Sequence, residues 1–263
     1  MNFEIPFLPE RTLKPRQTGL TMMMDKGLSN RQTEYFIDSC GDLVDYVKFG
    51  FGTSYITKNL RIKLAMYREA HIKCYLGGTL FEAFAVRNMF DEYRKLLDDL
   101  RLEVAEVSDG VIHISQDEKL QYISKLAEDY TVLSEVGSKT EADELPEDEW
   151  ISKMKTELEA GSYKVIAEAR ESGTIGIFNQ AGKAKTSMIE HISGEIGAEN
   201  VLWEAPQKEQ QVWFINHYGA NVNLGNIAPQ EVIPLETLRL GLRGDTFFNF
   251  LPEDLKNQTT ESP

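Results

Sequence analysis

The chain has 263 residues, of which 41% are hydrophobic, and its formal net charge is −14 at pH 7. The length suits one barrel of roughly 250 residues, and no window approaches the roughly 20 consecutive apolar residues that span a bilayer. The negative charge argues against general binding to nucleic acid or to a membrane surface, because such binding needs clustered basic groups.

The amino terminus, MNFEIPFLPERTLKPR, lacks the basic lead and apolar core of a signal peptide. Cys40 and Cys74 are too few for a disulfide framework or a cysteine metal site. We therefore expect a cytoplasmic protein with two buried thiols. Pro6, Pro9 and Pro15 indicate that residues 1–15 form an extended strap over the outside of the fold.

Eight apolar runs follow, and each ends in a charged or glycine-bearing turn. These predicted strands start near residues 20, 45, 72, 103, 131, 164, 201 and 221. Helices are predicted at 31–41, 60–70, 81–100, 117–129, 186–196, 207–218 and 235–246. Ser29 or Asn30 is expected to cap the first of these helices and Thr79 the third. The acidic run 141–149 reads as a solvated loop and helix start, and residues 252–263 as a flexible tail.

Regular alternation of strands and helices indicates a parallel sheet, because parallel neighbours need a crossover connection. Eight such units in about 250 residues match a single-domain (β/α)8 TIM barrel spanning residues 1–263. A doubly wound open sheet is the alternative. In a barrel, the chemistry is expected at the carboxyl-terminal ends of the strands.

The predicted strand ends carry many ionisable side chains. Burying so many is costly unless they are paired, solvated or bound to an ion, so either neighbouring strands exchange salt bridges or a ligand or metal uses them. Carboxylates without cysteine or clustered histidine favour a hard ion such as magnesium. The side chains are Asp25, Glu82, Glu106, Asp109, Glu135, Glu168, Glu171, Glu204, Lys26, Lys48, Lys139, Arg170, Asn223 and Asn226.

Several familiar motifs are absent. GIFNQAGK at 176–183 resembles a phosphate loop, but Ala184 replaces the required Ser or Thr. GFG at 50–52 lacks the third glycine of a dinucleotide fingerprint. Gly225 and Asn226 remain a candidate phosphate cradle, because barrels often bind phosphate behind strands seven and eight.

The ordered set of turns resembles the phosphosulfolactate synthase family over nearly the whole chain. The segments that carry the resemblance are KPRQTGLTMMMDKGL (14–28), DYVKFGFGTS (45–54), GGTLFE (77–82), EVSDG (106–110), SEVGSK (134–139), VIAEARESG (165–173), WEAPQKEQQVWFI (203–215), NLGNI (223–227) and LRLGLRGDT (238–246). Phe51 stands where many members are expected to have tryptophan.

The resemblance implies a lyase on a TIM barrel that assembles as a homo-oligomer and adds sulfite to phosphoenolpyruvate, giving (2R)-3-phospho-sulfolactate for sulfolactate or coenzyme M biosynthesis. It implies a Mg2+ ion that stabilises an enolate, with Lys139 as the general acid. Candidate metal ligands are Glu106, Glu135 and Glu168, with Glu204 as a substitute. Candidate substrate-binding residues are Arg16, Lys26, Lys48, Arg170, Asn223, Gly225 and Asn226.

Two other functions stay open from the sequence. Lys139 and Lys48 would also suit a barrel aldolase or an enolase-like lyase that acts on a phosphorylated carboxylate. A non-catalytic module that binds an anionic metabolite or a protein partner is the second. The number of subunits, the pathway that uses the product and a lid role for residues 140–149 cannot be predicted.

Overall fold

The computed structural model describes residues 3–137, 145–169 and 172–257. Its strands are β1 (Thr21–Met24), β2 (Tyr46–Phe49), β3 (Lys73–Leu76), β4 (Val104–Val107), β5 (Thr131–Val136), β6 (Ser162–Ala167), β7 (Val201–Glu204) and β8 (Leu224–Ile227). Its α-helices are α1 (Asn30–Cys40), α2 (Thr53–Ile56), α3 (Leu60–Glu69), α4 (Gly78–Ala85), α5 (Phe90–Leu100), α6 (Gln116–Ala127), α7 (Glu147–Glu159), α8 (Thr186–Ile196), α9 (Lys208–Tyr218), α10 (Val232–Arg239) and α11 (Glu253–Asn257). Short 3-10 turns occupy Gly41–Leu43, Ala198–Asn200 and Pro229–Glu231.

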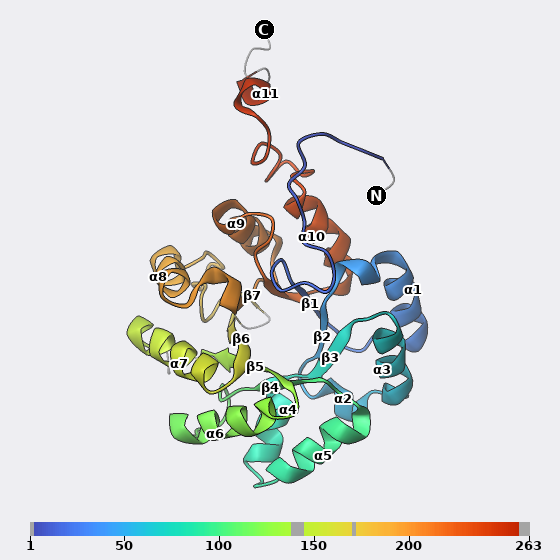
Figure 1. Ribbon diagram of the computed structural model, residues 1–263, viewed down its shortest axis with the longest axis vertical. Helices are drawn as coiled ribbons and strands as arrows, with labels where there is room; N and C mark the ends of the chain where they lie inside the picture. The colour runs from blue at the N-terminus through green and yellow to red at the C-terminus, as the bar shows by residue number, and fades with distance from the viewer. Residues whose placement is uncertain (1–2, 138–144, 170–171, 258–263) are drawn as a thin grey trace.

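The eight strands form one parallel sheet in the order β3-β2-β1-β8-β7-β6-β5-β4. β1 pairs with both β2 and β8, so the first and last strands are neighbours, as barrel closure requires. β3 and β4 end the hydrogen-bonded order and lie against one another. Figure 1 shows the helices arranged around this nearly closed barrel. The (β/α)8 prediction is confirmed, and the open doubly wound sheet is not formed.

Apolar side chains form two separate clusters, one outside the barrel wall and one inside it. A large cluster packs between the strands and the surrounding helices, as expected for parallel strands covered on their outer faces. A smaller cluster lies apart from it and comes almost wholly from alternating strand positions, which indicates the barrel interior. Its members are Leu20, Met22, Tyr46, Tyr75, Val104, Leu133, Ile166 and Leu202.

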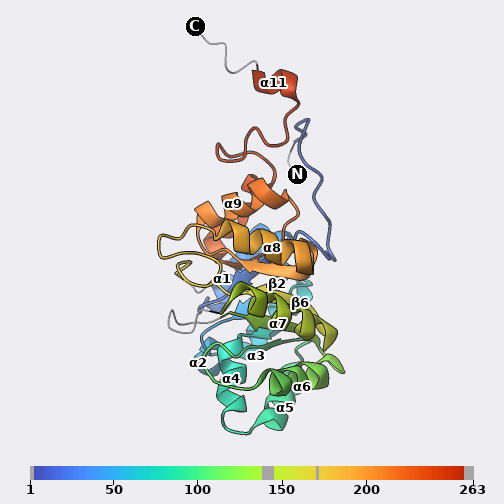
Figure 2. The same cartoon turned by 90° about the vertical axis from the view of Figure 1, so that its left-hand side faces the viewer.

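At the amino-terminal end of the barrel, two arginines hold neighbouring segments together. Arg239, fully buried on α10, donates hydrogen bonds to the carbonyl oxygens of Leu20, Ala220 and Val222 at 3.1, 2.6 and 2.7 Å. Arg11 in the amino-terminal segment forms an ion pair with Glu236 at 2.9 Å. Figures 1 and 2 show this segment and the one carrying α11 extending beyond the barrel on the side of α9 and α10.

Three helix predictions need correction. The helix expected at 81–100 is two helices, α4 and α5, because Asn88 adopts a left-handed conformation (φ 55°) that ends the first of them. Gly77, not Thr79, is the residue that precedes α4 as its N-cap. The last predicted helix begins earlier than expected and ends at Arg239, before Gly241 with φ 68°. None of the helices among the described residues is long and apolar enough to cross a membrane.

Candidate active site

Four consecutive strands place a glutamate above the apolar floor of the barrel. In β4, β5, β6 and β7 an interior aliphatic residue is followed two positions later by Glu106, Glu135, Glu168 and Glu204 respectively. A strand alternates its side chains with a period of two, so each glutamate faces the same interior, one layer nearer the carboxyl-terminal end. All four are buried, with at most 3% of each residue exposed.

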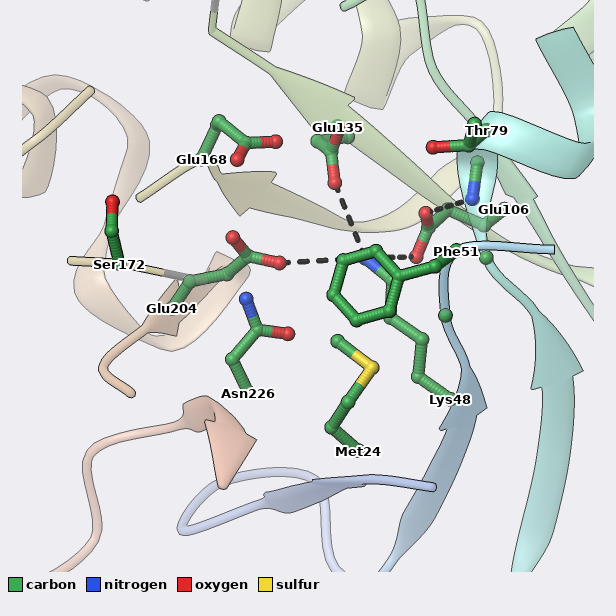
Figure 3. Close-up of a pocket in the computed structure, with 13 residues that line it drawn as sticks. Met24, Lys48, Phe51, Thr79, Glu106, Glu135, Glu168, Ser172, Glu204 and Asn226 are labelled. Carbon is green, nitrogen blue, oxygen red and sulfur yellow. Dashed lines mark hydrogen bonds and ion pairs between the residues drawn. The ribbon is translucent and has the colours of Figure 1, made fainter. Parts of the chain in front are cut away.

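These glutamates line a pocket of about 400 Å3 at the carboxyl-terminal ends of the strands. Figure 3 shows the carboxylates of Glu106, Glu135 and Glu204 around the Lys48 side chain, which rises from β2, and Glu168 to one side of them. Among the described lining residues the four glutamates face one lysine, so this part of the site has a formal charge of −3 when all five are ionised. The other lining residues are Met24, Gly50, Phe51, Gly77, Gly78, Thr79, Ser172 and Asn226.

Lys48 forms ion pairs with three of the four glutamates. Its Nζ lies 3.0 Å from Glu106 Oε2, 3.2 Å from Glu135 Oε2 and 3.4 Å from Glu204 Oε1. Burial acts to lower the pKa of Lys48, but attraction to these carboxylates outweighs burial and holds that pKa well above its ordinary value. Lys48 is therefore an ammonium ion in this structure.

Glu106 is the carboxyl that burial affects most clearly. Complete burial raises the pKa of Glu106 to about 7, although Lys48 opposes the shift, and Glu135 adds to it by repulsion. The backbone N–H of Gly78, at the start of α4, donates a hydrogen bond to Glu106 Oε1. Glu106 thus exchanges its proton near neutral pH while Lys48 stays charged.

Three of the glutamates form a group that fits a hard cation. Oxygens of Glu135, Glu168 and Glu204 all lie within 4.8 Å of one another, and each residue is buried. Asn226, which also lines the pocket, has a buried side-chain oxygen with no hydrogen-bond partner in the described part of the chain. Oxygen ligands and a formally negative surround are what Mg2+ prefers. The sequence predicted Glu106 as a metal ligand with Glu135 and Glu168, and Glu204 as its substitute. In the structure Glu204 is the third member of the group, and Glu106 forms an ion pair with Lys48 instead.

A buried polar network supports Glu135. Ser108 Oγ lies 3.1 Å from Glu135 Oε1 and 2.5 Å from Glu82 Oε1 on α4. Glu82 Oε2 accepts hydrogen bonds from the backbone N–H groups of Val111 and Ile112 at 2.7 and 2.9 Å. This network therefore fixes the loop after β4 to α4 and holds Ser108 against Glu135.

The backbone of Glu135 is held separately by Lys119. This fully buried lysine on α6 donates to the carbonyl oxygen of Glu135 at 2.7 Å and forms ion pairs with Asp109 and Glu157, both at 2.8 Å. Sequence reasoning missed Lys119 because it lies within a helix; its place on the helix's apolar stripe was the only available signal.

Two further predicted residues lie at the same end of the barrel. Lys26 follows β1, and its Nζ lies 5.8 Å from the centre of the Phe51 ring, which lines the pocket. Gly225 in β8 is buried, and a Cβ there would approach the terminal methyl of Met22 to 2.8 Å, so a larger residue would displace that flexible side chain. Asn226 next to it adopts φ 57°.

Arg16 and Asn223 are not brought to the pocket. Arg16 forms an ion pair with Asp45 at 3.1 Å, just before β2 begins. Asn223 precedes β8, accepts a hydrogen bond from the N–H of Leu20 and donates to the carbonyl oxygen of Val201. Both residues precede their strands in the chain, so they belong to the amino-terminal end. Asn223 was expected at the carboxyl-terminal end of a strand, and that expectation is corrected; Arg16 was expected to bind substrate, and it does not line the described pocket.

Lys139 and Arg170 lie outside the described residues. The described chain reaches Gly137, directly after β5, where φ is 136°. A Cβ at Gly137 would approach Glu168 Cβ to 2.6 Å and the Trp150 ring to 2.7 Å. The end of β5 therefore needs glycine both for its backbone conformation and for the close approach of Glu168.

Comparisons with known proteins point in one direction. A sequence model of the family described as (2R)-phospho-3-sulfolactate synthase (ComA) matches residues 9–245. The chain is 41% identical to the phosphosulfolactate synthase of Bacillus subtilis (strain 168), covering 92% of this chain and 97% of that protein. It is 43% identical to the phosphosulfolactate synthase of Methanocaldococcus jannaschii, covering 88% and 94% respectively.

Among solved structures, 3-hexulose-6-phosphate synthase from Salmonella typhimurium superimposes with a TM-score of 0.55 at 13% identity. The match covers 85% of this chain and 100% of that chain. At this level of identity the likeness concerns the fold alone.

Proposed function

This chain belongs to the phosphosulfolactate synthase family, and we propose that it adds sulfite to phosphoenolpyruvate to form (2R)-3-phospho-sulfolactate. The observation that supports the proposal most is the buried group of Glu135, Glu168 and Glu204 at the ends of three adjacent strands. The proposal extends to a homo-oligomer in the cytoplasm whose product serves sulfolactate or coenzyme M biosynthesis.

We propose that Glu135, Glu168 and Glu204 hold a Mg2+ ion, with the Asn226 amide oxygen as a further candidate ligand. When bound, this ion would supply a Lewis acid for the negative charge that develops on the substrate carboxylate. The four glutamates and Lys48 leave a formal charge of −3, which would repel two anionic substrates. A divalent cation in the pocket would reduce that formal charge to −1 and so weaken the repulsion.

The proposed reaction forms one C–S bond and one C–H bond. The sulfur lone pair of sulfite attacks the methylene carbon of phosphoenolpyruvate, and the electrons of the C=C bond move toward the carboxylate as an enolate. A proton then adds to the carbon that carries the phosphate ester, and no bond to phosphate breaks. A lysine can serve as this acid when its surroundings bring its pKa near the working pH.

We assign the proton donor to Lys139, two residues after Gly137. Gly137, the last described residue of this segment, packs closely against Glu168, which lines the pocket. Donation from one face would set the R configuration. Lys26 and Arg170 are the proposed clamps for the anionic groups, and Gly225 with Asn226 is the proposed phosphate cradle.

The test is a two-substrate assay on the purified protein. We expect phosphoenolpyruvate to disappear only when sulfite and Mg2+ are both present, without release of inorganic phosphate. A chelator should stop the reaction, and an excess of Mg2+ should restore it. Consumption of phosphoenolpyruvate without sulfite, or with phosphate release, would contradict the proposal.

A further inference from the structure

The contacts of Lys48 fall on two of the three carboxylates that could hold a cation. Nζ lies 3.2 Å from Glu135 Oε2 and 3.4 Å from Glu204 Oε1, and both glutamates belong to the three-carboxylate group. Its shortest contact, 3.0 Å to Glu106 Oε2, is made to a carboxylate outside that group. The ammonium therefore lies between the proposed metal site and a separate anionic partner.

The other oxygens of Glu135 and Glu204 face groups that are fixed to the barrel wall. Glu135 Oε1 lies 3.1 Å from Ser108 Oγ, and Glu204 Oε2 accepts a hydrogen bond from the backbone N–H of Ala169 at 3.1 Å. The oxygens that face Lys48 contact instead a flexible side chain with a four-carbon stem. A cation that binds these two oxygens would have to displace Lys48 Nζ from them.

We propose that Lys48 is the counter-ion of the metal-free site and that it competes with Mg2+ for Glu135 and Glu204. The inference rests on the metal site of the proposed function and adds a residue that sets the affinity of that site. Two cations drawn to the same carboxylates repel one another strongly in a buried pocket, where the effective dielectric constant is far below that of water. Lys48 therefore lowers the affinity for the ion.

The same residue stabilises the protein when no ion is bound. Without Lys48, Glu106, Glu135 and Glu204 would each lose a buried ion pair, and removing one partner of a buried pair is destabilising. A bound divalent cation would then recover more stability than it does in the wild type. Loss of Lys48 should thus weaken the metal-free fold and strengthen metal binding together, which a purely structural ion pair does not predict.

The experiment measures Mn2+ binding by electron paramagnetic resonance, without substrates. The test variant is Lys48→Met, and the matched control is Lys63→Met. Lys63 is also buried and forms an ion pair with Asp25 at 2.8 Å, but Asp25 is not in the metal group. We expect the Mn2+ Kd to fall at least roughly tenfold in Lys48→Met, and to stay at the wild-type value in Lys63→Met.

A second variant and a second readout keep the test decisive. Lys48→Arg keeps the charge, so its Mn2+ Kd should remain within a few-fold of the wild type. If Lys48→Met is unfolded in chelator, added Mg2+ should restore its circular dichroism spectrum. If it is folded, Mg2+ should raise its Tm more than the Tm of the wild type.

Three results would overturn the inference. They are an unchanged or weaker Mn2+ Kd in Lys48→Met, a variant that Mg2+ cannot refold, and an absence of Mn2+ binding in every protein. The last would also remove the proposed metal site. If instead the wild type binds Mn2+ and consumes phosphoenolpyruvate with sulfite, but Lys48→Met binds no more tightly, the proposed function stands and only the role of Lys48 is wrong.

Discussion

Glu106 and Lys48 are neighbouring buried side chains whose pKa values are both raised, but for different reasons. Both are enclosed in the barrel, yet Lys48 keeps its charge because carboxylates surround it, whereas the pKa of Glu106 rises to about 7 because burial outweighs its one close cation. The folded protein therefore holds a proton on Glu106 over a pH range in which the unfolded chain has lost it.

This difference predicts how stability changes with pH in the metal-free protein. Between about pH 4.5 and 7 the folded state binds the extra proton, so raising the pH through this window costs stability, and lowering it restores stability. Glu106→Gln removes the titration while keeping an oxygen for the Gly78 N–H. Chemical denaturation in chelator should show Glu106→Gln gaining on the wild type by on the order of 3 kcal/mol across the window.

The comparison between the two proteins isolates Glu106 from the other titrating groups, since both chains share those groups. The gain should level off above about pH 7, where folded and unfolded Glu106 are both ionised. Stability curves that run parallel for the two proteins throughout this window would show that Glu106 has an ordinary pKa.

Single residues were predictable where the end of a strand was recognised. Glu106, Glu135 and Glu168 were found because each ends an apolar run, and the structure buries all three in one pocket. Asn223 was misplaced because the eighth strand begins at Leu224, a few residues later than predicted, which moves Asn223 to the other end of the barrel. The contacts of Lys48 join strands that are far apart in the sequence, so the local sequence around each strand could not predict which carboxylates Lys48 would contact.

At the scale of elements, the turn after β5 couples the strand to its neighbour. Gly137 combines a φ of 136° with a direction in which a Cβ would lie 2.6 Å from Glu168 Cβ. Gly137→Ala should lower the free energy of unfolding by at least ~1–2 kcal/mol, because the added methyl meets both backbone strain and a steric clash. It should also weaken Mn2+ binding, because relief of the clash moves Glu168.

Gly194→Ala is the matched control for that substitution. Gly194 lies inside α8, and nothing lies within 4 Å of the Cβ that alanine would add. This variant should be more stable by about 0.5–1 kcal/mol, because alanine favours the helix, and should bind Mn2+ as the wild type does. Equal effects on unfolding in the two variants would refute the account of the β5 turn.

The elements themselves were largely predictable, because strands and helices alternate with few irregularities. All eight strands occur near their expected starts. The break between α4 and α5 was missed because Asn88, which ends α4, is flanked by residues that favour neither a turn nor a break. The short α2 was missed because four residues hold too little periodicity to recognise.

At the scale of the whole molecule, the overall charge and the proposed substrates have the same sign. The chain carries −14, and both phosphoenolpyruvate and sulfite are anions. The described pocket is itself formally negative, so long-range attraction cannot bring the substrates in. Binding must then depend on short-range cations, which is why a metal ion held by Glu135, Glu168 and Glu204 is the centre of the proposed chemistry.

The most direct test of that chemistry follows the new bonds in the product made in heavy water. With Mg2+, phosphoenolpyruvate and sulfite, mass spectrometry should find one product that has gained a sulfonate and a single deuterium on the carbon bearing phosphate. The Lys139→Ala variant should remain folded and bind substrate but form this product at least ~100-fold more slowly. A wild-type protein that releases inorganic phosphate, or that yields no product containing both sulfur and phosphate, would contradict the account.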